Sequence, residues 1–273
     1  GRIGILVQSS DQRPEVAGRT KNGSAEARKR WFLDHYESVP NEIERFLAGT
    51  NIDFRGKRVV DLGCGDGSIS LGVMNKFKPA DLLGLELSPV DVEYLKQQSK
   101  EFLGLELPRG LRFGTCEAES IPVANAMTDL VMSWSVFEHV SNPVVVLSEI
   151  HRILRPGGLM FLQIWPLYHS QRGSHLWNWY PDGWEHLLQT SNDLRSDFIN
   201  NFEVEESLRE EMLVDYDSLN KITVDQLQRA ILSAGLTIRR IELQSDQIDV
   251  PESLSHFSLF DLIILLSLFY AFR

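Results

Sequence analysis

Cysteine is scarce in this 273-residue sequence, which holds two, Cys64 and Cys116. Two cysteines support neither a disulfide framework nor a cysteine-rich metal site. Basic residues are also few, since 27 Lys and Arg stand against 38 Asp and Glu and leave a net charge of −11. This negative charge opposes nonspecific attraction to nucleic acid and to anionic lipid, so we expect neither as a partner.

The sequence also lacks an apolar run of the roughly 20 residues that a membrane-spanning helix requires. Residues 262–272 are apolar apart from Ser267, but they make up only about half of that length. The amino end shows no basic segment followed by an apolar one, as a secretory signal would. Together with the low cysteine content, these features predict a cytoplasmic protein without a membrane span.

The most informative stretch is 58–68, which reads Arg-Val-Val-Asp-Leu-Gly-Cys-Gly-Asp-Gly-Ser. Its β-branched run ending in Asp61 predicts a buried strand, and the alternate glycines Gly63, Gly65 and Gly67 predict a turn directly after it. Without a Cβ, the backbone of such a turn can approach a ligand closely. The pattern predicts one wall of a cofactor pocket, although a tight strand-to-helix turn with no ligand also fits these residues.

Downstream of the turn, strand patterns and helix patterns alternate along the chain. Further strands are expected at 82–87, 111–115, 129–134, 159–165, 236–243 and 262–272; helices are expected after the glycines, from Ser88-Pro89 to about residue 102, from Asn142-Pro143 to the stop at 155–158, and after the capping box of Thr223 and Gln226. This spacing requires parallel strands joined by crossover helices. The sequence therefore predicts a single α/β domain over residues 25–273, with a seven-stranded, Rossmann-like, doubly wound sheet.

Three segments have a different character. Residues 1–24 are polar and contain glycine, so we expect them to be poorly ordered. Residues 25–48 predict two short helices with a break at Pro40. The insertion 165–222 holds four of the six tryptophans and three of the seven histidines, a content that argues against disorder. We expect it to form a lid or the wall of an acceptor site.

The glycine turn departs from the dinucleotide fingerprint, in which the third glycine falls five residues after the first. Here that position is Ser68, and the third glycine is Gly67. Together with Asp61, the pattern Asp-x-Gly-x-Gly-x-Gly resembles motif I of class I S-adenosylmethionine-dependent methyltransferases, and the similarity continues to about residue 164. The resemblance implies S-adenosylmethionine as cofactor, S-adenosylhomocysteine as product, and a mostly parallel sheet whose last strand is antiparallel.

The resemblance also implies where the cofactor is held. Glu86 closes the second strand, where the family places a carboxylate that accepts both ribose hydroxyls. Glu117 and Ala118 are similar to the acidic-Ala pair beside the adenine, although the family more often has Asp at the first position. The implied cofactor-binding residues are Asp61, Gly63, Gly65, Gly67, Glu86, Leu87, Glu117, Ala118 and Ser133.

Methyl transfer from a sulfonium centre is an in-line displacement, so the enzyme aligns the acceptor and, for a hydroxyl acceptor, removes its proton. His139 follows the fourth strand, in a segment similar to the subgroup with a Glu-His pair there, and is either the general base or a structural histidine. His175 and His169 are the alternative bases. These two and His186 lack a carboxylate or cysteine at helical spacing, so we expect no metal site.

The acceptor is least specified by the sequence. Residues 166–184 are similar to a segment of some bacterial methyltransferases encoded with polysaccharide-building enzymes. Aromatic rings there suit a sugar or an aromatic acceptor, and equally a small core under a long loop. We predict O-methylation of a small molecule or saccharide intermediate; the alternatives are a C- or N-methyltransferase of the same fold, an NAD-dependent oxidoreductase and a noncatalytic cofactor-binding protein. The oligomeric state is not predicted.

Overall fold

The computed structural model describes residues 2–7, 23–245 and 250–273, without the side chains of 2–7, 263 and 265–270. Its residues group into two compact units. The N-terminal unit comprises 12–134, 149–161 and 272–273, and the C-terminal unit comprises 1–11, 135–148 and 162–271.

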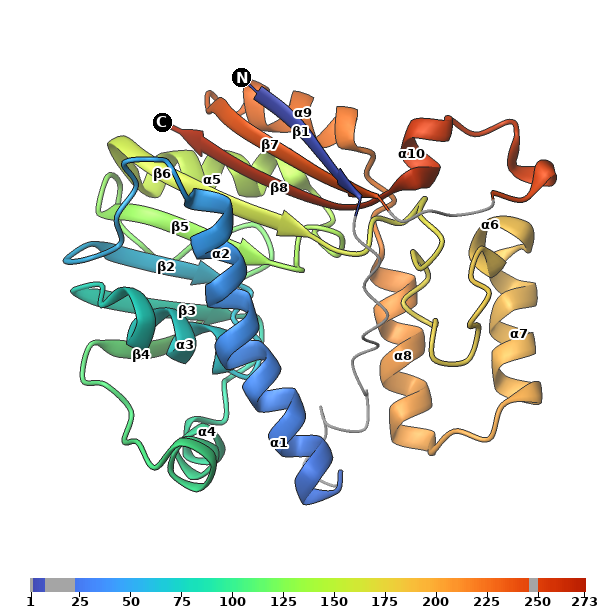
Figure 1. Cartoon of the computed structure of the whole chain (residues 1–273), viewed down its shortest axis with the longest axis horizontal. Helices are drawn as coiled ribbons and strands as arrows, with labels where there is room; N and C mark the ends of the chain where they lie inside the picture. The colour runs from blue at the N-terminus through green and yellow to red at the C-terminus, as the bar shows by residue number, and fades with distance from the viewer. Residues whose placement is uncertain (1, 8–22, 246–249) are drawn as a thin grey trace. The chain divides into compact units, whose positions relative to one another are not determined.

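The strands are those of a mostly parallel α/β sheet with the order β1-β7-β8-β6-β5-β2-β3-β4 (Figure 1). Their bounds are β1 (Arg2–Val7), β2 (Arg58–Leu62), β3 (Asp81–Glu86), β4 (Leu111–Thr115), β5 (Thr128–Trp134), β6 (Leu154–Ile164), β7 (Thr237–Ser245) and β8 (Ile264–Phe272). The pairs β5–β2, β2–β3 and β3–β4 are parallel. All seven predicted strands are present, and the predicted α/β fold is confirmed.

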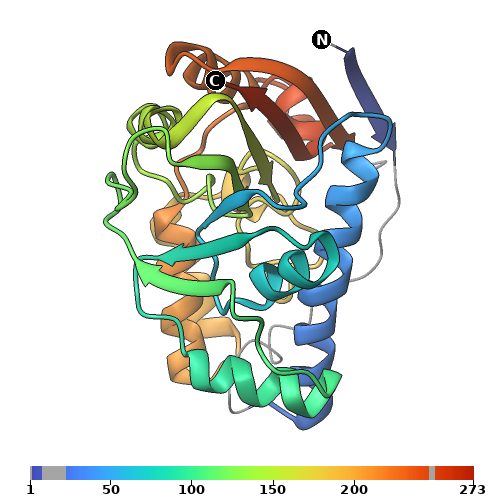
Figure 2. The same cartoon turned by 90° about the vertical axis from the view of Figure 1, so that its left-hand side faces the viewer.

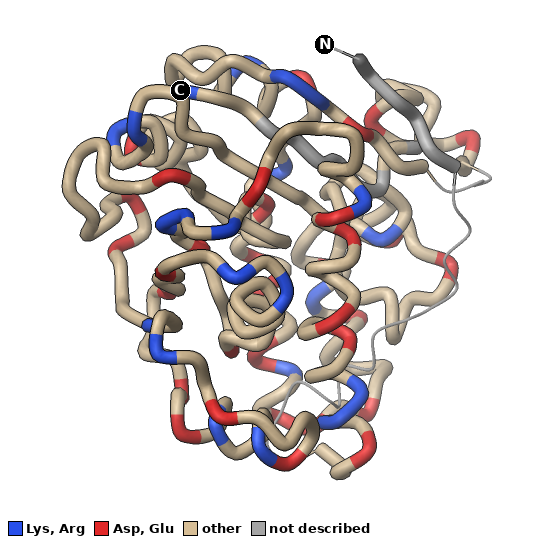
Figure 3. The backbone as a smooth tube through the Cα atoms, turned by 60° about the vertical axis from the view of Figure 1, so that its left-hand side comes forward, with Lys and Arg blue, Asp and Glu red and all other residues tan. Residues whose placement is uncertain are grey.

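The helices are α1 (Ala25–Leu33), α2 (Val39–Leu47), α3 (Ser68–Phe77), α4 (Val92–Gln98), α5 (Pro143–Ile153), α6 (Glu185–Leu188), α7 (Ser191–Asn201), α8 (Glu206–Ser218), α9 (Val224–Ser233) and α10 (Leu259–Ile263). The predicted capping box is confirmed, because Thr223 and Gln226 cap α9 reciprocally. None of the helices in the described ranges has the length and apolar character needed to cross a membrane. Acidic and basic positions are interspersed along the backbone in Figure 3.

Strand β1 was not predicted. Residues 2–7 pair in parallel with β7, with Arg2 opposite Arg240 and Val7 opposite Ser245. Its sequence after Arg2, Ile-Gly-Ile-Leu-Val, is apolar enough for a sheet. The expectation that residues 1–24 are poorly ordered stays a prediction. Residue 1 and residues 8–22 lie outside the described residues.

The break predicted at Pro40 is also wrong. Figure 2 shows α1 and α2, in blue, as parts of one continuous helical run. The π-helical segment Asp34–Ser38 joins them and leaves Pro40 in the first turn of α2. Proline has no N–H to donate, and its ring clashes with the carbonyl four residues before it in a regular α-helix; the π-helical segment before Pro40 accommodates both effects.

Two other boundaries differ from the predictions. Asp91, rather than Ser88, caps α4, because its Oδ1 accepts a hydrogen bond of 2.9 Å from the N–H of Tyr94. The expected stop at 155–158 is instead the start of β6. Gly157 N–H donates to the carbonyl of Arg273 over 3.3 Å, and Arg273 N–H donates to Gly158 over 3.1 Å. The chain's last residue thus meets the beginning of β6, as an antiparallel last strand requires.

Candidate functional site

The glycine turn follows β2 directly in the N-terminal unit. Gly63 N–H donates to the carbonyl of Leu85 in β3 over 2.8 Å, which ties the start of the turn to the neighbouring strand. Gly63, Gly65 and Gly67 have φ angles of 76°, 56° and 84°. Side-chain-bearing residues rarely adopt these left-handed conformations, so the path of the turn depends on glycine.

Two of these glycines face different surroundings. A Cβ built on Gly67 would lie 2.7 Å from the ring of Phe113 and 2.9 Å from the side chain of Leu95. A Cβ built on Gly65 would meet no atom within 4 Å. Gly67 therefore serves the packing of the turn, whereas Gly65 borders open space that a ligand can enter.

We expect Gly67→Ala to lower the free energy of unfolding by about 2–4 kcal/mol, because left-handed backbone strain and overpacking act together. Gly65→Ala, the matched control, meets backbone strain alone and should cost about 1–2 kcal/mol. Urea unfolding of both variants tests this difference. An equal loss of unfolding free energy in the two variants would show that the side chains of Phe113 and Leu95 move aside without an energetic penalty.

Glu86 holds the other side of the turn. Its Oε2 accepts a hydrogen bond of 2.9 Å from Gly65 N–H, and its Oε1 accepts one of 2.8 Å from Leu87 N–H. Each carboxylate oxygen keeps a second lone pair, so both can still accept a ligand hydroxyl. Leu87 is 62% exposed beside it. The arrangement fits the predicted ribose contact.

Asp61 lies buried beneath the turn, 1% exposed. The hydroxyl of Ser70 in α3 donates to its Oδ2 over 2.5 Å, which links β2 to the helix after the turn. Burial raises the pKa of Asp61 to about 7; the hydrogen bond from Ser70 opposes this rise and the charge of Glu86 adds to it. Asp61 therefore supports the turn from behind.

The raised pKa of Asp61 predicts a pH-dependent stability. The folded chain keeps a proton on this carboxyl up to about pH 7, whereas the unfolded chain releases it near the ordinary value of 3.8. Stability should therefore fall as pH rises between these values, by about 1.4 kcal/mol per pH unit for one proton. We expect Asp61→Asn to remove this slope. Denaturant unfolding from pH 4.5 to 8 measures it, and parallel curves for the two proteins would contradict the assignment.

The remaining predicted cofactor residues differ in exposure. Glu117 and Ala118 are exposed after β4, where Glu117 forms an isolated bridge to Ser120. Ser133 is buried, and its hydroxyl donates to the carbonyl of Leu62 over 2.9 Å, so this side chain connects β5 to β2. Contact of these three residues with the cofactor stays a prediction.

Sequence reasoning missed a second support of the turn. Trp31 in α1 donates from Nε1 to Oδ2 of Asp66 over 3.2 Å, while Oδ1 of Asp66 accepts the N–H of Ser68 over 2.9 Å. The ring of His35 stacks on Trp31 with centroids 4.1 Å apart. No local pattern signals this contact, because the partners are 35 positions apart.

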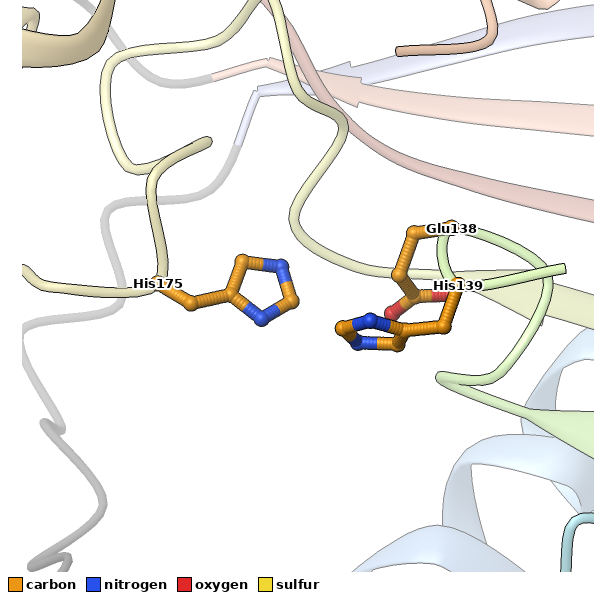
Figure 4. A group of neighbouring side chains, drawn as sticks. All are labelled: Glu138, His139 and His175. Atoms are coloured by element: carbon orange, nitrogen blue, oxygen red, sulfur yellow. The ribbon is translucent and has the colours of Figure 1, made fainter. Parts of the chain in front are cut away.

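In the C-terminal unit, Glu138, His139 and His175 converge (Figure 4). One carboxylate oxygen of Glu138 and one ring nitrogen of each histidine lie within 4.8 Å of one another. The two imidazole rings meet edge to face with centroids 5.1 Å apart. We call these three residues the Glu-His-His cluster. Of the predicted bases, His139 and His175 are thus brought together.

The tautomer of His139 follows from its neighbour Ser218 at the end of α8. The Ser218 hydroxyl donates its proton to the carbonyl of Asp215 over 2.7 Å. With its proton on that carbonyl, the hydroxyl oxygen accepts from Nδ1–H of His139, which lies 2.6 Å away. The lone pair of the neutral imidazole is thereby assigned to Nε2, the atom able to accept a proton or bind a metal.

Glu138 is 2% exposed, and neither of its carboxylate oxygens makes a hydrogen bond of normal geometry within the described part of the chain. Burial raises the pKa of Glu138 to about 8; the N–H groups of Glu138 and Trp165 oppose this rise, and the charge of Asp215 adds to it. A buried carboxyl without such partners is costly, so it points to a missing ligand.

His175 has a φ of 64°, an uncommon conformation for a residue other than glycine and one found preferentially at functional sites. Its ring lies 5.7 Å from that of Trp177, which lies 5.3 Å from that of Trp165. Trp177 Nε1 is buried and makes no hydrogen bond to any described residue. This donor and the two indole rings provide an aromatic surface beside the cluster.

Other aromatic residues of the insertion form a core. Trp184 is 3% exposed and packs with Leu254 and Leu262. Trp179 packs against Phe198 of α7 with centroids 5.1 Å apart. The core interpretation therefore holds for Trp179 and Trp184. A role of Trp165 and Trp177 in binding the acceptor stays a prediction.

The other two insertion histidines lie outside the cluster. The ring of His169 contacts Tyr168 and Phe257, and burial lowers its pKa. His186 is 4% exposed, its Nε2 lies 2.6 Å from the carbonyl of Tyr168, and burial lowers its pKa to about 4. A histidine held neutral by burial and bonded to the backbone has a structural role.

Known proteins resemble this chain in sequence over somewhat less than half of its length. Residues 60–162 match the family described as methyltransferase domain. The ubiquinone biosynthesis O-methyltransferase of Cereibacter sphaeroides is 29% identical over 124 residues, which are 45% of this chain and 47% of that protein. The malonyl-[acyl-carrier protein] O-methyltransferase of Hahella chejuensis is 33% identical over 125 residues, which are 46% of this chain and 42% of that protein.

The chain thus spans less than half of the length of these relatives. Among solved structures, phosphoethanolamine N-methyltransferase 2 of Haemonchus contortus, in complex with S-adenosyl-L-methionine, shares the fold with a TM-score of 0.53 and 15% identity. That likeness covers 92% of this chain and 58% of the other.

Proposed function

Because residues 60–162 match a methyltransferase domain, we propose that this protein is a class I S-adenosylmethionine-dependent enzyme that transfers a methyl group from that cofactor to a hydroxyl of a small molecule. Saccharide intermediates are included among the acceptors. The expected cytoplasmic location stays a prediction.

The observation that carries this proposal is the joint geometry of the glycine turn and Glu86. The carboxylate is fixed by the N–H groups of Gly65 and Leu87 and keeps lone pairs for two hydroxyls. The space beside Gly65 is open, as close approach of a ligand to the backbone requires. A carboxylate that accepts a pair of hydroxyls beside a glycine turn fits an adenosine ribose.

Bound S-adenosylmethionine supplies a methyl group on a positively charged sulfur. The chain's own residues then have to position the acceptor and take its proton. His139 suits the second task, because Ser218 fixes the tautomer in which Nε2 accepts a proton. Trp165 and Trp177 suit the first, because flat rings bind an aromatic acceptor or the apolar face of a sugar.

The names of the two relatives favour oxygen as the methylated atom, since both are O-methyltransferases. Their acceptors differ in class, so they do not select one for this chain. A nitrogen or carbon acceptor needs little or no base, and such an enzyme would tolerate loss of the cluster histidines. The choice of atom therefore depends on His139 and His175.

The test is a screen with methyl-labelled S-adenosylmethionine against hydroxyl acceptors, comprising phenols, catechols and sugar nucleotides, with primary amines as the comparison. We expect label transfer to at least one hydroxyl acceptor. Transfer to amines alone would contradict O-methylation and favour the N-methyltransferase.

A further inference from the structure

We propose that the Glu-His-His cluster binds one divalent transition-metal ion, with Zn²⁺ as the reference ion. The sequence predicted no metal site because the insertion histidines have no carboxylate near them in the sequence. The structure supplies that carboxylate from Glu138, next to His139 and 37 positions before His175 in the chain. It brings the three ligand atoms within 4.8 Å of one another.

The donor set suits such an ion. Two imidazoles and one carboxylate are the protein ligands of open zinc sites, which leave a further position for water or substrate. Imidazole nitrogens also suit other first-row divalent ions, whereas Mg²⁺ prefers oxygen ligands. The site should therefore bind Zn²⁺ or Co²⁺ and discriminate against Mg²⁺.

A metal ion would satisfy Glu138, whose carboxylate is buried without a hydrogen bond of normal geometry to any described residue. A cation would provide the partner that both oxygens lack, because it would balance the charge of the ionised carboxylate and bind its lone pairs. This second observation is independent of the approach of the two histidines.

Metal-binding histidines usually donate a hydrogen bond from the ring nitrogen that does not bind the metal, and Ser218 accepts such a bond from His139. Its oxygen accepts Nδ1–H of His139 over 2.6 Å, which orients the ring and leaves the Nε2 lone pair for the ion. In a tetrahedral site, ligand atoms about 2.0–2.2 Å from zinc lie about 3.3 Å apart. Binding therefore requires the three side chains to close by at most about 1.5 Å. His175 lies on a loop rather than in a helix or strand.

The binding itself does not depend on the proposed methyl transfer, but the role of the ion rests on it. An ion with an open position would hold the acceptor hydroxyl and lower its pKa. His139 would then act as a ligand, and the acidified hydroxyl would release its proton to solvent water rather than to a free imidazole.

Zinc titration of the chelator-treated full chain, in competition with a chromophoric chelator, tests the proposal. We expect one Zn²⁺ per chain with a Kd of about 1 µM or below, and no competition from Mg²⁺. Glu138→Gln and His175→Asn should each weaken binding by about 100-fold or more; Asn is chosen because it tolerates the left-handed backbone. Ser218→Ala should weaken it by about 10- to 100-fold.

His169→Ala is the control, because this histidine lies in the same unit but outside the cluster, and it should keep the wild-type affinity. If Glu138→Gln fails to fold, as judged by thermal melting, His175→Asn decides the outcome alone. Absence of zinc binding by the wild-type chain, or equal binding by the cluster variants, would overturn the metal site.

S-adenosylhomocysteine titration of the same samples separates the two proposals. Zinc binding without S-adenosylhomocysteine binding contradicts the methyltransferase and leaves the metal site standing. The reverse result refutes only the metal site.

Discussion

Glu86→Ala is expected to weaken S-adenosylhomocysteine binding by about 5- to 150-fold, which corresponds to about 1–3 kcal/mol. The variant removes the acceptor of the two ribose hydroxyls. It also leaves the N–H groups of Gly65 and Leu87 without the carboxylate that holds them at 2.9 and 2.8 Å. Calorimetric titration measures the loss.

Two further variants sharpen this test. Glu86→Gln keeps one oxygen acceptor and should fall between the wild type and Glu86→Ala. Glu93→Ala removes an exposed carboxylate of α4 that pairs with Lys96, and it should leave the affinity within about twofold. Wild-type affinity in Glu86→Ala would show that the ribose assignment is wrong.

His139→Ala is expected to lower kcat for a hydroxyl acceptor by about 10²- to 10⁴-fold, the usual contribution of a positioned acid or base. The expectation holds whether His139 accepts the proton itself or holds an ion that acidifies the acceptor. S-adenosylhomocysteine affinity should stay within about twofold, because His139 is not among the proposed cofactor contacts. Steady-state kinetics and calorimetry on the same variant measure both quantities.

The controls distinguish a chemical role from a structural one. His169→Ala should retain most of the turnover, since its ring contacts Tyr168 and Phe257 and is not part of the cluster. Ser218→Ala should lower kcat less than His139→Ala does. The imidazole remains in this variant and loses only the hydrogen bond that favours one tautomer. Turnover within about threefold of wild type in His139→Ala would contradict a role in proton removal and favour an N- or C-methyltransferase.

The cofactor half of the candidate site was predictable because its signals are local. Asp61, the alternate glycines and Glu86 stand at the ends of consecutive parallel strands, and such ends lie together at one edge of a sheet. The structure adds what those patterns do not contain, namely the burial of Asp61 and the donation from Trp31 to Asp66, whose partners are distant in sequence.

The Glu-His-His cluster shows the opposite case. Glu138 and His139 follow β5 and were visible as a pair, but His175 reaches them through the path of a long loop and Ser218 through the end of α8. No periodicity encodes such approaches. The boundary errors have simpler causes: a π-helical segment accommodates Pro40, and Arg273 extends β6 to residues predicted as a stop.

The most direct test of the central claim is one calorimetric comparison of S-adenosylhomocysteine and NAD on the full chain. The methyltransferase assignment predicts one S-adenosylhomocysteine bound per chain, with a Kd of about 1–100 µM, and no heat of binding with NAD. Binding of NAD without binding of S-adenosylhomocysteine would contradict the assignment in favour of an oxidoreductase, and binding of neither would contradict it in favour of a noncatalytic protein.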